Sequence, residues 1–213
     1  LPISNMISVA VNPLPVASIS ANGSTTFCDG NNVELSSTLA ATYLWNNGST
    51  TQNIFATATG NYSVAVTDSN GCSATSNMVS VAVNPLPVAS ISANGSTTFC
   101  DGNNVELSST VAATYLWNNG STKQNIFATV TGNYSVVVTD SNGCSSTSNM
   151  ISVAVNPLPV ASISANGSTT FCDGNNVELS STVAATYLWN NGSTTQNIFA
   201  TATGNYSVAV TDS

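Results

Sequence analysis

Residues 60–72 read Gly-Asn-Tyr-Ser-Val-Ala-Val-Thr-Asp-Ser-Asn-Gly-Cys. Tyr62, Val64 and Val66 alternate with polar or small residues, which is the two-residue period of a strand with one buried face. Asn70-Gly71 then favours a tight turn, and Cys72 follows it directly. The stretch recurs with one change at 132–144, and 204–213 repeats its beginning. The sequence therefore predicts a β-protein made of copies of one unit.

The copies are 72 residues long. Asn-Pro-Leu-Pro begins at Asn12, Asn84 and Asn156, and both 84 − 12 and 156 − 84 equal 72. A period this long is typical of small domains in tandem. We expect residues 1–12 to be the last strand of a preceding repeat, followed by repeats at 13–84, 85–156 and 157–213, the third without its last strand. The proline-rich linkers are short and stiff, so the domains should follow one another end to end.

Each copy predicts an immunoglobulin-like β-sandwich. Turn residues arrive every 8–12 positions and no segment shows a helical period, so the fold class is all-β. A tryptophan on the third strand and the spacing Gly-x-Tyr-x-Val, typical of a tyrosine corner, favour this sandwich over a barrel. The expected core tryptophans and corner tyrosines are Trp45, Tyr62, Trp117, Tyr134, Trp189 and Tyr206.

Composition excludes several classes of function. The formal net charge is −8, Lys123 is the single base, and there is no histidine. Nucleic acid and anionic lipid both require Lys and Arg, so neither is an expected partner. Without histidine no Ser-His-Asp or Cys-His centre can form, and we expect neither an enzyme nor a cofactor. The sequence contains no run of 18 apolar residues, so we expect no membrane insertion. The first residues lack the form of a signal peptide, as in a mature or excised chain.

The five cysteines keep the period of 72. Pairing within each copy predicts the disulfides Cys28–Cys72 and Cys100–Cys144, joining the start of the second strand to the start of the last. Cys172 is then left over, because its partner would stand at position 216. A bond between Cys72 and Cys100 is the alternative. Disulfides in a small repeated domain indicate an oxidising compartment.

The combined motifs resemble a known family. They are Cys-x-Gly at Cys28, Tyr-x-Trp at Tyr43, Gly-Ser-Thr-Thr at Gly48, the strand at 60–68 and Gly-Cys at Gly71. Together they are similar to the Ig-like and PKD-like tandem repeats of giant cell-surface or secreted proteins of Bacteroidetes, some of them gliding adhesins exported by the type IX system. The resemblance covers all three copies. It implies an extracellular, cell-surface location and an adhesive or spacer role, and it supplies no catalytic residue.

Few residues suggest a binding site. Asp29 with Asn31, and Asp68 with Asn70, could offer oxygen ligands to Ca²⁺, but Asp and Asn are also common turn residues, and neither run matches an EF-hand loop. Glu34 is the only glutamate of its copy, so a glycosidase pair has little support. Phe55 is expected on the face opposite Ile54, where it could contact a sugar, a partner or a neighbouring domain.

Two functions remain from different classes. The first is a structural and adhesive segment of an extracellular filament or stalk, whose expected partners are copies of itself and surface glycans. In a variant of this hypothesis the spare last strand, Leu1 to Val11, completes the third repeat of another chain by donor-strand addition. The alternative is a carbohydrate-binding module array of a secreted polysaccharide-degrading protein.

Overall fold

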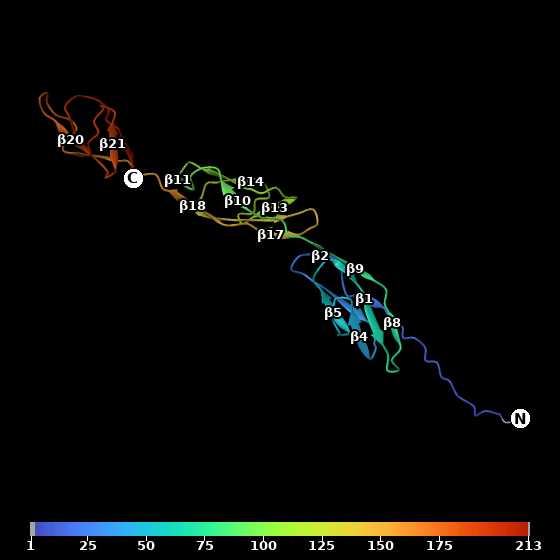
Figure 1. Ribbon diagram of the computed structural model, residues 1–213. Helices are drawn as coiled ribbons and strands as arrows, with labels where there is room; N and C mark the ends of the chain where they lie inside the picture. Colours follow the sequence, from blue (N-terminus) through green and yellow to red (C-terminus); the bar gives the residue numbers. More distant parts are fainter. Residues whose placement is uncertain (1–2, 213) are drawn as a thin grey trace. The chain divides into compact units, whose positions relative to one another are not determined.

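The computed structural model describes residues 3–212, and these residues form an all-β fold without a helix (Figure 1). None of them therefore belongs to a helix able to cross a membrane. The first repeat contains β1 Ile19–Ala21, β2 Thr26–Cys28, β3 Val33–Ser37, β4 Thr42–Trp45, β5 Asn53–Ala56, β6 Gly60–Tyr62, β7 Val64–Thr67, β8 Ser73–Thr75 and β9 Val79–Asn84.

The second repeat contains the same nine strands in the same order. They are β10 Ile91–Ala93, β11 Thr98–Cys100, β12 Val105–Ser109, β13 Thr114–Trp117, β14 Asn125–Ala128, β15 Gly132–Tyr134, β16 Val136–Thr139, β17 Ser145–Thr147 and β18 Ile151–Asn156. The third repeat has fewer strands within the described residues. They are β19 Ile163–Asn166, β20 Val177–Ser181, β21 Thr186–Trp189, β22 Asn197–Ala200 and β23 Val208–Thr211.

The first repeat is a two-layer sandwich. One layer has the strand order β1-β3-β5, with antiparallel pairs. The other layer combines β4-β7-β8 with β2-β9-β6, in which β2 runs parallel to β9 and the other pairs are antiparallel. Since β6 leads directly into β7, the long stretch 60–67 pairs with different partners along its length. This arrangement of two mainly antiparallel layers is immunoglobulin-like.

The alternation in the sequence places the core between the layers. The predicted strand at 60–67 directs Val64 and Val66 inward, and both are completely buried. From the opposite layer Leu35 meets them, and Trp45 fills the centre with 1% of its surface exposed. The buried members of this core are Ile19, Val33, Leu35, Trp45, Ile54, Ala56, Val64, Val66 and Val81.

The chain divides into two compact units whose boundary runs through the second repeat. One unit holds the chain up to Ser92 together with Ser108–Ile126 and Tyr134–Ile151. It therefore contains the first repeat and the sheet β13-β16-β17. The other unit holds Ala93–Leu107, Phe127–Asn133 and the chain from Ser152 on. It contains the sheet β11-β18-β15 and the third repeat, whose core is built around Trp189.

Candidate functional site

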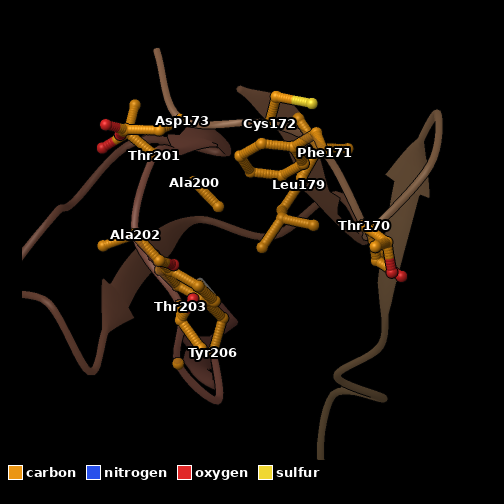
Figure 2. Close-up of a pocket in the computed structure, with 13 residues that line it drawn as sticks. Thr170, Phe171, Cys172, Asp173, Leu179, Ala200, Thr201, Ala202, Thr203 and Tyr206 are labelled. Carbon is orange, nitrogen blue, oxygen red and sulfur yellow. The ribbon is translucent and has the colours of Figure 1, made fainter. Parts of the chain in front are cut away.

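The third repeat contains an open groove at the position that β9 fills in the first repeat. There β9 lies between β2 and β6 and buries Val81 to 3% exposure. Within the described residues, no strand follows β23 and the third repeat has no equivalent of β9. A cavity of about 680 Å³ opens instead. Figure 2 shows Phe171, Leu179 and Tyr206 around it, with Cys172 at the rim.

The third repeat exposes apolar side chains that the other repeats bury. Val208 is half-buried, whereas the equivalent Val64 is completely buried. Ile163 is 37% exposed, whereas Ile19 is 7% exposed. The groove residues Phe171, Leu179 and Ala200 were not singled out from the sequence. They could have been found there, because they are the copies of Phe27, Leu35 and Ala56, each of which packs in the first core.

A matching strand sequence lies unpaired at the other end of the chain. Residues 4–15 and 148–159 are identical, Ser-Asn-Met-Ile-Ser-Val-Ala-Val-Asn-Pro-Leu-Pro. Residues 151–156 form β18, but residues 3–18 form no strand. The apolar side chains of Ile7, Val9 and Val11 are 82%, 81% and 89% exposed. Of the strand expected at Leu1 to Val11, Leu1 and Pro2 lie outside the described residues.

The contacts at the two ends of β9 show what an occupant of the groove must provide. The side-chain carbonyl of Asn77, two residues before β9, accepts a bond from the backbone N–H of Ile19 at 2.9 Å. At the other end, the backbone carbonyl of Asn84 accepts a bond from the N–H of Asp29 at 2.8 Å. In the third repeat Ile163 and Asp173 occupy the positions of these two donors.

Two further bonds hold the middle of β9. Ala82 donates its N–H to the carbonyl of Thr25 at 2.8 Å, and Val83 donates its N–H to the hydroxyl of Thr59 at 2.9 Å. The second repeat makes both of these bonds with β18. In the third repeat the same two acceptor positions are threonines that line the groove, Thr169 and Thr203.

The disulfide lies elsewhere than the sequence analysis expected. Cys28 is bonded to Cys144, 116 residues away, with 5.5 Å between the Cα atoms. The expected pairs Cys28–Cys72 and Cys100–Cys144 are therefore wrong, and so is the alternative pair of Cys72 with Cys100. Cys72, Cys100 and Cys172 are free thiols.

Strand direction explains why the two cysteines of one copy do not pair. Because β2 runs parallel to β9, Cys28 lies beside Asn84, at the end of the repeat where the linker begins. Cys72 precedes β8, at the start of the extended run that leads to Asn84. That run spans roughly 40 Å at about 3.3 Å per residue, whereas the Cα atoms of a disulfide lie within about 7 Å of each other. The two cysteines of one copy are therefore at opposite ends of the sandwich.

The linker explains why Cys144 is the partner. Ser146, in β17, donates its hydroxyl to the carbonyl of Pro87, the last residue of the linker that begins at Asn84. The turn before β17 is thus held against the end of that linker, while Cys28 lies beside its start. Cys144, in this turn, is completely buried.

The tyrosines and tryptophans take structural positions. Tyr62 donates its hydroxyl to the carbonyl of Ala58 at 3.0 Å, the bond that defines a tyrosine corner. Tyr206 makes the same bond to Ala202 at 2.9 Å. Trp45 donates its indole N–H to the carbonyl of Thr51 at 2.7 Å. The other expected core residues are Trp117 and Trp189, each 1% exposed, and Tyr134, 9% exposed.

The candidate calcium ligands are engaged in turns. Asp68 accepts bonds from the backbone N–H groups of Asn70 and Cys72, both at 2.9 Å, which fixes the turn between β7 and β8. Asp29 accepts a bond from the N–H of Gly30 at 3.0 Å, and Asn31 donates its N–H to the carbonyl of Cys28. Across residues 3–212, His, Cys, Asp and Glu side chains form no cluster of three that could hold a metal ion.

An exposed aromatic ring with polar neighbours recurs in each repeat. Phe55 is 66% exposed and pairs across the sheet with Glu34. Glu34 accepts bonds from the side-chain amides of Asn22 at 3.3 Å and Asn53 at 3.0 Å. Phe127 and Phe199 are similarly exposed. The first repeat thus presents its ring beside a carboxylate that is already hydrogen-bonded.

Comparisons with known proteins give no family for the chain. No family model matches it, and no curated protein matches it. Similar solved structures include murine CEACAM1b, at 16% identity and a TM-score of 0.32, covering 66% of this chain and 100% of that one. The fibronectin(III)-like modules of Clostridium thermocellum CbhA match at 13% identity and a TM-score of 0.31, covering 65% and 94%. These identities are too low to indicate function.

Proposed function

We propose that this chain is a structural and adhesive repeat segment of an extracellular, cell-surface filament, of the kind found in the repeat proteins that it resembles. Successive copies join by donor-strand addition, and the chain carries out no catalysis. Residues 4–12 of one copy enter the groove of the third repeat of another copy. The observation that carries the proposal is the identity of residues 4–15 with 148–159, the segment that contains β18 and fills the equivalent groove in the second repeat.

The identity fixes the register of the donated strand. Val9 takes the place of Val153, which is 3% exposed, and packs over Leu179. Asn5 faces the backbone of Ile163, as Asn149 faces Ile91 at 2.8 Å. Asn12 accepts a bond from the N–H of Asp173, as Asn156 does from Asp101 at 2.8 Å. When a strand adds to a sheet, its main-chain hydrogen bonds provide affinity and its alternate side chains provide specificity. The donated segment would provide both.

Two point variants of the donor segment test the proposal. Val9→Asp would place a charge at a buried position of the junction, whereas Ala10→Asp would place it at the position of Ala154, which is exposed in β18. We expect the wild-type chain and the Ala10→Asp chain to form multimers in light scattering after size-exclusion chromatography. We expect the Val9→Asp chain to stay monomeric. A monomeric wild-type chain, or multimers of the Val9→Asp chain, would overturn the proposal.

The exposed rings support carbohydrate binding as a second candidate function. Phe55, Phe127 and Phe199 repeat every 72 residues, so each repeat offers one exposed ring to a polysaccharide. Retention on an immobilised-polysaccharide column is the test. We expect the triple alanine variant at these positions to elute earlier than the wild type if the rings bind sugar. Equal elution of both chains from every polysaccharide tried would count against this function.

A further inference from the structure

We propose that a second disulfide, between Cys172 of one copy and Cys72 of the next, locks the junction covalently. The inference rests on the proposed donor-strand addition and names the chemistry that seals it. Cys172 occupies in the third repeat the position of Cys28, and Cys72 occupies in the first repeat the position of Cys144. The structure shows the bond between the equivalent pair already formed.

The surroundings of the observed bond reappear at the proposed one. Cys28 lies beside Asn84, and the linker from Asn84 to Pro87 leads into the repeat that supplies Cys144. In the proposed junction the donated Asn12 lies beside Cys172, and an identical linker, 12–15, leads into the repeat that supplies Cys72. In both cases the same four-residue linker therefore joins the strand beside one cysteine to the repeat that carries the other.

The turn that carries Cys72 already has the required conformation. Asp68 holds it through the N–H groups of Asn70 and Cys72, both at 2.9 Å. Asp140 makes the same two bonds, at the same distances, in the turn of Cys144. One contact differs, because Ala74 stands where Ser146 donates to the linker carbonyl.

The accessibility of the thiols agrees with this role. Cys172 is exposed at the rim of the groove and Cys72 is half-buried, whereas Cys144, whose bond is formed, is completely buried (Figure 2). Cys100 corresponds to Cys28 in the second repeat. It is an exposed free thiol in the described structure, and the proposal assigns it no partner.

The bond forms by thiol–disulfide exchange. The thiols of Cys172 and Cys72 lose two electrons and two protons, and a small disulfide such as oxidised glutathione accepts both and leaves as two thiols. Each copy inside a multimer then contains one internal disulfide, contributes to one disulfide at each of its ends and keeps one thiol.

The test uses the full chain in an oxidised and reduced glutathione buffer, with non-reducing electrophoresis and thiol counting. We expect a ladder of covalent multimers whose thiol content falls from three per chain in the monomer towards one per chain in long multimers, and peptic peptides that link Cys172 to Cys72 in mass spectrometry. Cys172→Ser and Cys72→Ser should each reduce the ladder to background while multimers persist in size-exclusion chromatography. Cys100→Ser, the matched control, should leave the ladder unchanged.

The outcomes separate the two proposals. Multimers that keep three thiols per chain, or a ladder that survives Cys172→Ser, would overturn the disulfide alone. A wild-type chain that forms neither multimers nor a ladder would overturn both proposals. The Val9→Asp chain should form neither, because its donor strand cannot enter the groove.

Discussion

The first and third repeats have nearly the same sequence but differ in structure. Residues 13–69 and 157–213 differ at a single aligned position, Leu39 and Val183. Residues 26–28 and 60–62 of the first repeat are the strands β2 and β6, whereas 170–172 and 204–206 of the third form no strand. Among the described strands, β2 and β6 pair only with β9. These segments are therefore strands because of their partner and not because of their local sequence.

The largest effect should come from damaging β9. Val81→Asp would bury an unpaired charge beside Val64 and Leu35, so the first repeat should lose roughly 3–5 kcal/mol of unfolding free energy and come to resemble the third. Val9→Asp, at the aligned position in the unpaired segment, should leave the stability of the monomer unchanged, because Val9 is 81% exposed. Scanning calorimetry of both variants measures this difference. Equal destabilisation by the two substitutions would show that residues 3–11 already pack on the chain.

Much of this fold follows from the sequence. Alternation at Tyr62, Val64 and Val66, a tryptophan on the third strand and regular turn signals predict an all-β sandwich, and the structure has that fold. The sequence also predicts that the third repeat lacks its last strand, because residues 157–213 contain no segment aligned with β9. These features depend on local patterns and on the alignment of copies, which a repeated sequence displays directly.

The disulfide pairing could not be predicted from the sequence, for a physical reason. The period of 72 lets a cysteine of the Cys28 type pair with a Cys72-type residue of its own copy or of the next. Choosing between them requires the direction of β2 relative to β9. The alternation of Thr-Phe-Cys at 26–28 is the same whether the strand pairs parallel or antiparallel, so pairing direction comes only from the tertiary structure.

A smaller effect is expected in amide hydrogen exchange, which should differ between β7 and β23 at the amides on one edge of the strand only. Val64-Ala65-Val66-Thr67 and Val208-Ala209-Val210-Thr211 are identical in sequence, so their intrinsic exchange rates are the same. β7 has β4 on one side and β8 on the other, whereas β23 pairs only with β21 among the described strands.

The register determines which amides differ. Val66 is paired with Ala74 of β8, and Val64 donates its N–H to the hydroxyl of Ser76, just after β8. In monomeric Val9→Asp chains, the amide of Val210 should therefore exchange about tenfold faster than that of Val66, because it has no β8 partner. Ala209 is paired with Leu188 of β21 and should exchange at a rate close to that of Ala65. Residue-resolved NMR distinguishes these amides. If Ala209 exchanged as fast as Val210, the whole of β23 would be frayed, and an absent neighbour on one edge would not account for the difference between the repeats.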